Sequence, residues 1–162
     1  MTPKVRTCLW FADHALEAAG LYVGLLPDSR ITAISRYPEG QQMAQPGRVL
    51  TVDLILAGTP YQLLNGGPHF SLSEAASISV ATEDQAETDR LWTALIADGG
   101  AESQCGWLKD RFGLSWQIVP RRAAALMSGP QAGRVWPALM QMRRIDIAAL
   151  EAAAGEAGPG GH

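Results

Sequence analysis

Two glutamines draw attention because each holds the same place in a repeated pattern. Residues 58–64 and 113–119 share a glycine, two spacers, an aromatic residue, a glutamine and two aliphatic residues. Strand burial does not require an amide after the aromatic, so Gln62 and Gln117 are candidates for polar groups in a binding pocket. An amide donates and accepts hydrogen bonds but does not titrate near neutral pH, as general acid–base catalysis requires. The two side chains therefore favour binding over proton transfer.

The other reactive side chains form no recognisable catalytic or metal-binding pattern. Cys8 and Cys105 lie far apart, and two cysteines without a secretory signal make neither a disulfide framework nor a zinc spacing. We expect buried thiols, with a pocket-lining or redox-sensitive role as the alternative. His14 lies at a helix start, His69 in a turn and His162 at the end of the chain. We expect capping or solvent-exposed roles for these histidines.

Five tryptophans are many for a chain of 162 residues. Trp92 and Trp136 lie in helical patterns, where packing in the core is the expected role. Trp10 and Trp107 lie on predicted strands, where they either stack on a planar ligand or are simply buried. Asp110 precedes a predicted turn at 111–113 and is expected to form that turn, with an active-site role as the alternative.

The elements that position these residues follow one order twice. In the first half, a strand at 4–11 leads to a helix with Asp13 as its expected N-cap, and strands follow at 31–37, 49–57 and 61–64. Turn-forming residues separate these strands: 38–40, 46–47 and 58–60. This half therefore predicts a βαβββ unit.

The second half repeats that order. A strand at 77–81 precedes a helix capped by Thr82 or Asp84. The expected apolar face of this helix has five members: Ala86, Leu91, Trp92, Leu95 and Ile96. Short strands follow at 102–105, 107–110 and 115–119. A shift of 70 residues also aligns the two helices from Glu17 with Glu87 to Asp28 with Asp98, although shared periodicity alone is an alternative explanation.

These patterns divide the chain into five segments. The first unit spans 1–66, a linker 67–75 and the second unit 76–120, followed by C-terminal helices at 121–154 and a disordered tail at 155–162. The stretch Asn65-Gly66-Gly67-Pro68 lies where the first unit meets the linker, and we expect it to need positive φ, with Asn65 as a possible pocket donor.

Composition narrows the class of protein. A length of 162 residues fits one domain or two half-domains that share a core, and 47% hydrophobic with 18% charged residues is ordinary for a globular protein. A net charge of −3 provides no broad positive field, so nucleic acid is not an expected partner. No apolar run reaches a membrane-spanning length and no secretory signal is visible, so we expect no membrane partner and a cytoplasmic location.

Several stretches resemble the PhnB-like branch of the vicinal oxygen chelate superfamily, which includes glyoxalase I, extradiol dioxygenases and bleomycin-resistance proteins. The similarity covers about residues 4–150, and the stretches that carry it are 10–31, 64–68, 105–120 and 143–147. It implies an α+β fold in which two βαβββ units form a half-open mixed-sheet barrel, with the C-terminal helices added. The branch often carries the name demethylubiquinone methyltransferase.

The resemblance also locates the positions at which related enzymes hold a divalent metal. They fall near Cys8, Gln62, Ser77 and Gln117, where two neutral amides and a hydroxyl replace His or Glu. We therefore expect no tightly bound metal and no cofactor. The glycine pairs at 66–67 and 99–100 lack the context of a nucleotide site, so an adenosylmethionine pocket is not expected.

The sequence thus favours a protein that binds a small, partly aromatic or amphipathic molecule without chemistry. The expected ligand-binding residues are Cys8, Trp10, Gln62, Asn65, Trp107 and Gln117. The alternative is an enzyme of the superfamily: a lyase, an isomerase or the methyltransferase of the family name. Relatives in this branch often pair units between chains, and the hinge at 65–74 leaves such swapping open, so we expect a homodimer.

Overall fold

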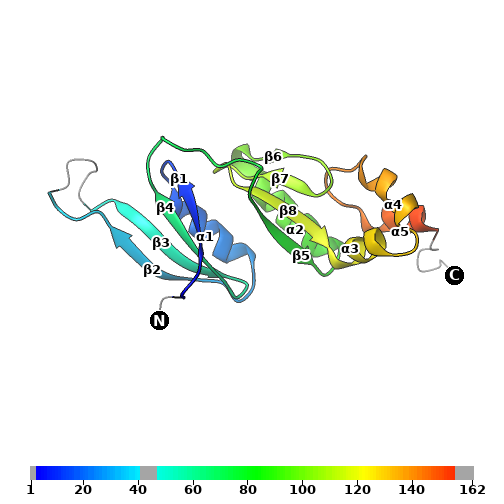
Figure 1. Ribbon diagram of the computed structural model, residues 1–162, viewed down its shortest axis with the longest axis horizontal. Coiled ribbons are helices and arrows are strands. Elements are labelled where there is room, and N and C mark those ends of the chain that lie inside the picture. The colour runs from blue at the N-terminus through cyan, green and yellow to red at the C-terminus, as the bar shows by residue number, and fades with distance from the viewer. Residues whose placement is uncertain (1–2, 41–46, 156–162) are drawn as a thin grey trace. The chain divides into compact units, whose positions relative to one another are not determined.

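The chain folds into two compact α+β units in a computed structural model that describes residues 3–40 and 47–155. The division falls between Leu72 and Ser73. Each unit contains a four-stranded mixed sheet that is not closed on itself, and each follows the order βαβββ (Figure 1). The twofold repeat predicted from the sequence is therefore confirmed.

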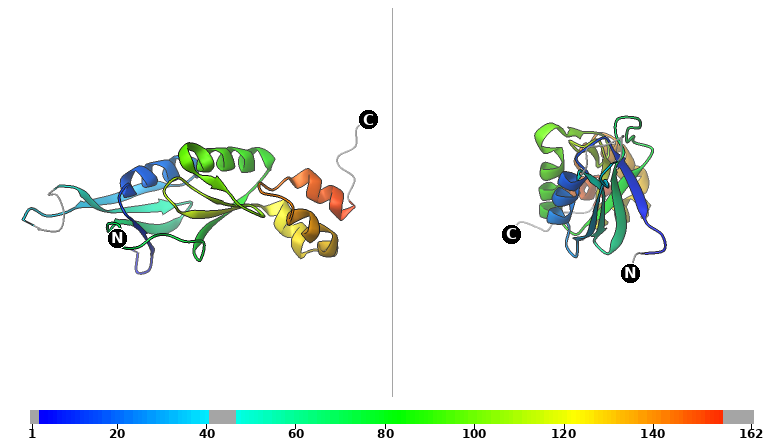
Figure 2. Two further views of the ribbon diagram at one scale, coloured as in Figure 1. Left: turned by 90° about the horizontal axis from the view of Figure 1, so that it is seen from above. Right: turned by 90° about the vertical axis from the view of Figure 1, so that its left-hand side faces the viewer.

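The first unit is built around a sheet with the strand order β1-β4-β3-β2. Its elements are β1 (Thr7–Phe11), α1 (Ala15–Leu25), β2 (Arg30–Arg36), β3 (Val49–Leu56) and β4 (Thr59–Asn65). Strands β1 and β4 run parallel, and the other neighbours are antiparallel. Helix α1 covers one face of this sheet, where Tyr22, Val52 and Leu63 are fully buried (Figure 2).

Helix α1 does not begin as predicted, because Asp13 is not its N-cap. The N-cap is His14, with a left-handed φ of 77° and no side-chain cap bond. Asn65 from the end of β4 supplies the missing acceptor: its Oδ1 accepts a hydrogen bond from the Ala15 amide at 2.9 Å. Asp13 instead pairs with Arg48, with 2.6 Å between its Oδ2 and the guanidinium Nη2. A tertiary contact thus replaces the local cap.

The second unit has the equivalent strand order β5-β8-β7-β6. Its elements are β5 (Ser77–Thr82), α2 (Gln85–Ile96), a 3₁₀ turn (Ala97–Gly99), β6 (Ala101–Glu102), β7 (Trp107–Lys109) and β8 (Ser115–Pro120). Asp84 caps α2 by accepting a hydrogen bond from the Glu87 amide at 2.8 Å. Thr88 is buried on this helix and Ala86 is exposed, so Thr88 replaces Ala86 on the predicted apolar face.

Strand β6 is shorter than the predicted strand at 102–105, because the chain turns there. Cys105 and Gly106 both have positive φ, 57° and 84°. Their amides donate to the carbonyls of Met142 and Arg143 at 2.8 and 2.7 Å, rather than to a neighbouring strand. The turn therefore connects the second sheet to the chain that leads into the last helix.

Three helices complete the second unit: α3 (Arg121–Ser128), α4 (Ala132–Leu139) and α5 (Ile147–Ala154). They enclose a small core of their own, which contains Leu126, Val135, Leu139, Ile145 and Leu150 together with two alanines. The C-terminal helices predicted from the sequence are thus present. Residues 156–162 of the expected disordered tail lie outside the described residues.

Trp136 corrects one prediction, because it is not a core residue. Its side chain is 48% exposed, while Trp92 in α2 is 2% exposed as expected. Val135 and Leu139 of α4 face the helical core, and Trp136 is rotated off that face by one position. Its indole Nε1 donates to the Met127 carbonyl at 3.2 Å.

Candidate functional site

The face of the first sheet turned away from α1, which we call the open face, brings several of the predicted site residues together. Side chains alternate across a strand, so the burial of Leu9 against α1 places Cys8 and Trp10 of β1 on the open face. Gln62 lies directly beside Cys8 in the register, and Asp53 lies directly beside Gln62 on the other side. Three adjacent strands thus present Cys8, Gln62 and Asp53 in one row.

A polar network holds this row. Asp53 accepts a hydrogen bond from Arg6 Nη1 at its Oδ2, 2.7 Å away, and another from Gln62 Nε2 at its Oδ1, 2.9 Å away. The side chains of Arg6 and Asp53 are only 24% and 22% exposed. Gln62 Oε1 accepts no hydrogen bond from any residue in the described part of the chain. It is therefore available to a donor group on a ligand.

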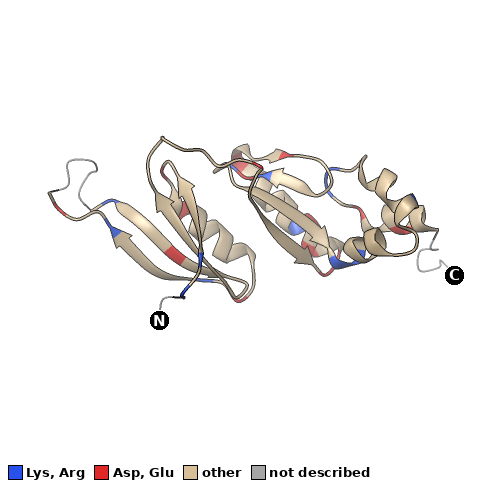
Figure 3. Cartoon of the chain, in the orientation of Figure 1, with Lys and Arg blue, Asp and Glu red and all other residues tan. Residues whose placement is uncertain are grey.

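Sequence reasoning did not identify Arg6 or Asp53 as site residues. The available signal was the position of Asp53, the only charged residue of strand β3, which Figure 3 shows as tan apart from one red segment. A charged residue inside a half-buried strand needs a partner, and here Arg6 and Gln62 supply it. Arg6 precedes β1 and gives no such signal by itself.

Cys8 is an exposed thiol, so the prediction of a buried cysteine is wrong for it. Partial burial of the sulfur still raises the pKa of the Cys8 thiol; the nearby Arg6 charge lowers this pKa and Asp53 raises it. The thiol is therefore protonated at neutral pH and is not an activated nucleophile. Partial burial likewise raises the pKa of Tyr61, which keeps its phenol neutral.

A hollow of about 310 Å³ lies at the Arg6 end of this sheet. Its polar lining includes Arg6, Arg30, Asp53 and Tyr61, and Ile55 and Pro60 are among its apolar lining residues. Arg30 is opposite Ile55 in the register of β2 and β3. The hollow therefore combines charged groups with an apolar floor, the composition of a small-molecule site.

A second hollow, of about 440 Å³, lies where β1 and β4 end. Its lining includes Trp10, Tyr37, Arg48, Asn65 and His69. The side chain of Asn65 is engaged on both atoms, since Oδ1 caps α1 and Nδ2 donates to the Val49 carbonyl at 3.1 Å. In the structure Asn65 thus organises the edge of this hollow.

Trp10 is fixed in place by its surroundings. Its Nε1 donates to the Gly67 carbonyl at 2.9 Å, and its ring packs edge to face against Phe70 with 4.9 Å between the ring centroids. A Cβ on Gly66 would overlap the indole ring of Trp10, so this glycine makes room for the tryptophan. Positive φ, expected for the glycine pair, is found at Gly67 alone.

The second sheet repeats part of this arrangement on its own open face. Gln117 Nε2 donates to Ser77 Oγ at 2.9 Å, and Trp107 lies directly opposite Gln117 in the register of β7 and β8. The register partner of Gln117 on β5 is Ser79, whereas the corresponding partner of Gln62 is Cys8. Ser79, not Ser77, is therefore the positional equivalent of Cys8.

Asp110 forms the turn, as the sequence indicated. It is 2% exposed, and its Oδ1 accepts hydrogen bonds from the amides of Phe112 and Leu114 at 2.9 and 3.0 Å. Its Oδ2 accepts another from Trp116 Nε1 at 2.9 Å. Both carboxylate oxygens serve the β7–β8 turn, which excludes the alternative of a pocket carboxylate.

Two histidines fall within the described residues and both are exposed. His14 Nδ1 lies 3.2 Å from Glu17 Oε2 on the surface of α1, and His69 lies in the segment after β4. The solvent-exposed role expected for them is confirmed. His162 lies outside the described residues.

The donor set does not fit a metal centre of the kind found in the superfamily. Among the described residues, no group of three or more His, Cys, Asp and Glu side chains is arranged to hold a metal ion. At the row on the first sheet, Asp53 is already neutralised by Arg6 and the neighbouring donors are an amide and a protonated thiol.

An adenosylmethionine site is equally poorly matched. The turns from strand to helix that could hold a nucleotide are residues 12–14 after β1 and residues 83–84 after β5, and neither contains a glycine. The Trp10 ring fills the space beside Gly66, and the backbone of Ile96 fills the space beside Gly100. The methyl-transfer chemistry implied by the family name has no matching cofactor site in the described residues.

Comparisons with known proteins agree with the fold. The profile of the family described as 3-demethylubiquinone-9 3-methyltransferase matches residues 3–119. The PhnB protein of Bacillus cereus, whose description carries the same methyltransferase name, is 30% identical, with a TM-score of 0.66 over 73% of this chain and 99% of that one. A Pseudomonas aeruginosa protein shares the fold at 20% identity, with a TM-score of 0.60 over 74% of this chain and 98% of that one.

A glyoxylase/bleomycin resistance protein/dioxygenase domain from Frankia is 14% identical, with a TM-score of 0.45 over 74% of this chain and 93% of that one. No curated protein matches the chain in sequence. In the described part of the chain, no helix has the length and apolar character needed to cross a membrane. The chain belongs to the family described as 3-demethylubiquinone-9 3-methyltransferase.

Proposed function

We propose that this protein binds a small molecule on the open face of its first sheet without a tightly bound metal. The row of Cys8, Gln62 and Asp53 carries the proposal, because Cys8 and Gln62 fall near positions at which, by the family resemblance, related enzymes hold a metal. Here the row offers hydrogen bonds in place of metal ligands, with the Gln62 amide oxygen as a free acceptor. The adjacent hollow provides apolar surface for the body of the ligand.

The titration behaviour of the row favours binding over catalysis. General acid–base chemistry needs a group whose pKa lies near the working pH. The pKa values of Cys8 and Tyr61 are both raised from values that already lie above neutrality, so neither group changes charge near pH 7. Cys8 and Gln62 therefore act as neutral hydrogen-bonding groups in this proposal, and Trp10 and Asn65 shape the second hollow.

The open face of the second sheet has a corresponding role in the proposal. Gln117 uses its amide nitrogen on Ser77, as Gln62 uses its nitrogen on Asp53. Trp107 is half-buried beside Gln117 and offers a ring for stacking. The family resemblance further supports a homodimer, in which such open faces are covered by pairing of units.

The test compares the wild-type protein with Gln62→Leu, which replaces the amide with an apolar side chain. Thermal-shift screening of a small-molecule library should find compounds that stabilise the wild type and stabilise the variant far less. Native mass spectrometry of protein purified from its host should show a retained small molecule that the variant loses. Gln131→Leu, on the exposed start of α4, is the matched control. Equal stabilisation of the wild type and Gln62→Leu by every compound would contradict the proposal.

A further inference from the structure

The hollow at the Arg6 end of the first sheet carries an unbalanced charge. Its lining contains two guanidinium groups, Arg6 and Arg30, and one carboxylate, Asp53. Arg6 and Asp53 neutralise each other at 2.7 Å. The side chain of Arg30 makes no hydrogen bond or ion pair with any residue that the structure describes. One positive charge in the hollow is therefore left without a counter-ion among the described residues.

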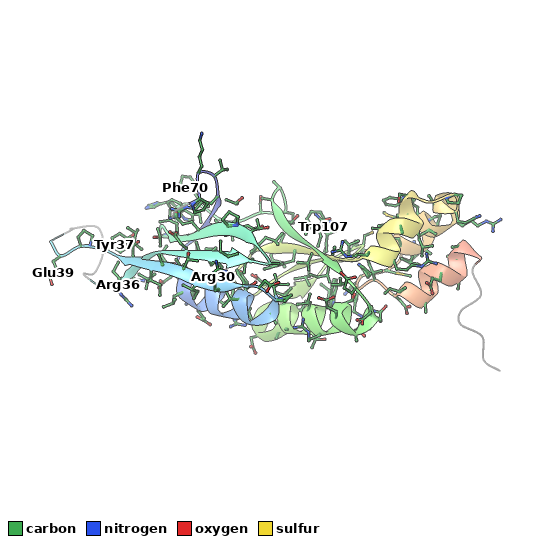
Figure 4. The ribbon with its side chains drawn as sticks, turned by 90° about the horizontal axis from the view of Figure 1, so that it is seen from below. Arg30, Arg36, Tyr37, Glu39, Phe70 and Trp107 are labelled. Carbon is green, nitrogen blue, oxygen red and sulfur yellow. The ribbon has the colours of Figure 1, made fainter. Side chains whose placement is uncertain are left out.

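The position of Arg30 relates this charge to the proposed ligand site. Arg30 begins β2 and is opposite Ile55, two residues along β3 from Asp53. Residues two apart on a strand share a face, so Asp53 and Ile55 both lie on the open face beside Arg30. Figure 4 labels Arg30 and Arg36, the two ends of β2. The free charge therefore borders the same row that contains Gln62.

We infer that the ligand of this site is an anion, with one negatively charged group for Arg30 and an apolar body for the floor of the hollow. This inference rests on the proposed function and names its ligand class. A planar guanidinium presents a fork of donors that matches a carboxylate, sulfonate or phosphate group. Ile55 and Pro60 provide apolar contact for the rest of the molecule, and Gln62 Oε1 accepts a hydrogen bond from it.

The test uses two fluorescent probes that share one aromatic body. These are 1-anilinonaphthalene-8-sulfonate, which is anionic, and N-phenyl-1-naphthylamine, which lacks the sulfonate. The wild type should bind the anionic probe about 2- to 5-fold more tightly than the neutral one, the scale expected for one exposed charged contact. In Arg30→Gln this preference should disappear while the affinity for the neutral probe stays the same.

Three further variants sharpen the result. Arg30→Lys keeps the charge without the fork and should restore part of the preference. Arg30→Glu should reverse it in favour of the neutral probe. Arg36→Gln is the matched control, because Arg36 is an exposed arginine on the same strand whose Nη1 is bonded to the Gly47 carbonyl. It should leave both affinities unchanged.

The possible results distinguish a failure of the anion inference from a failure of the proposed small-molecule binding. Equal binding of both probes to the wild type, or an unchanged preference in Arg30→Gln, overturns the anion inference and leaves small-molecule binding standing. If neither probe binds and Gln62→Leu also fails to alter any ligand effect in the library screen, both the inference and the proposed function are wrong.

Discussion

At the scale of single residues, Asn65 is a predicted binding residue whose side chain has a structural role. The sequence suggests a pocket donor, whereas the structure gives its oxygen to the start of α1 and its amide to β3. The Asn65 oxygen accepts the hydrogen bond from the first turn of α1 that an N-cap side chain usually accepts, although Asn65 is 50 residues away from Ala15 in the sequence. Sequence spacing cannot reveal such a cap, because it depends on the register between β1 and β4.

Replacement of Asn65 by alanine should therefore destabilise the fold. The loss of both hydrogen bonds should lower the free energy of unfolding by about 1–2 kcal/mol in urea titrations. Asn65→Asp keeps the acceptor for the Ala15 amide and should be less damaging. Asp13→Ala, which removes only the exposed pair with Arg48, should change stability by less than about 0.5 kcal/mol. An effect of Asp13→Ala as large as that of Asn65→Ala would mean that Asp13 is the cap in solution.

The row of Cys8, Gln62 and Asp53 leads to a prediction of gained metal affinity. Adjacent strands are about 4.8 Å apart, so Gln62→Glu would place a second carboxylate between Asp53 and the Cys8 sulfur. We expect calorimetry to show Zn²⁺ binding at least about 10-fold tighter than in the wild type, because the new carboxylate raises the number of anionic donors from two to three once binding deprotonates the thiol.

The matched control is Gln117→Glu on the second sheet. Its neighbours are Ser77, Ser79 and Trp107, which offer no anionic donor. This variant should bind Zn²⁺ no better than the wild type. Equal gains in the two glutamate variants, or no gain in Gln62→Glu, would show that the row does not converge on a common point.

At the scale of elements, periodicity was enough to predict two βαβββ units and the C-terminal helices. Apolar residues recur at every second position in a half-buried strand and at every third or fourth position in an amphipathic helix, so the sequence shows which faces are buried. The failures arose where long-range contacts decide the outcome. Asp13 looked like a cap but pairs with Arg48, and Trp136 lies in a helical pattern yet faces solvent. The candidate site was found through Gln62 and completed by Arg6 and Asp53, whose pairing depends on tertiary structure.

At this scale we make one prediction, which concerns the contact that attaches the last helix, α5, to α2. Gln85 Nε2 donates to the Ile145 carbonyl at 3.0 Å, and its Oε1 accepts a hydrogen bond from the Ile147 amide at 2.9 Å. Gln85→Ala leaves both backbone groups without these partners and should lower the free energy of unfolding by about 1–3 kcal/mol. Hydrogen exchange should accelerate in α5 before it does in the first sheet.

Gln131→Ala provides the comparison for Gln85, because Gln131 is exposed and its side chain caps nothing in α4. Its stability should stay within about 0.5 kcal/mol of the wild type. Unchanged exchange of the α5 amides in Gln85→Ala would show that the C-terminal core, with Ile145 and Leu150 buried in it, holds the helix without this anchor.

At the scale of the whole molecule, each helix of the repeat covers one face of its own sheet, and the other face carries the proposed binding residues. Half-buried tryptophans, Trp10 and Trp107, lie on these open faces. Residues 66–76, between β4 and β5, form neither helix nor strand and contain two glycines and a proline. A connection of this kind allows units to pair within a chain or between chains.

We therefore expect a homodimer in solution, consistent with the pairing implied by the family resemblance. Sedimentation velocity at micromolar concentration should give about twice the chain mass of 17.3 kDa, and an obligate interface of this kind should be large and apolar. Trp107→Glu places a charge on the open face of the second sheet and should weaken the dimer, whereas Trp136→Glu, on exposed α4, should not. A monomer that is insensitive to both substitutions would show that two units of the same chain close on each other, because burial of the open faces then requires no second copy.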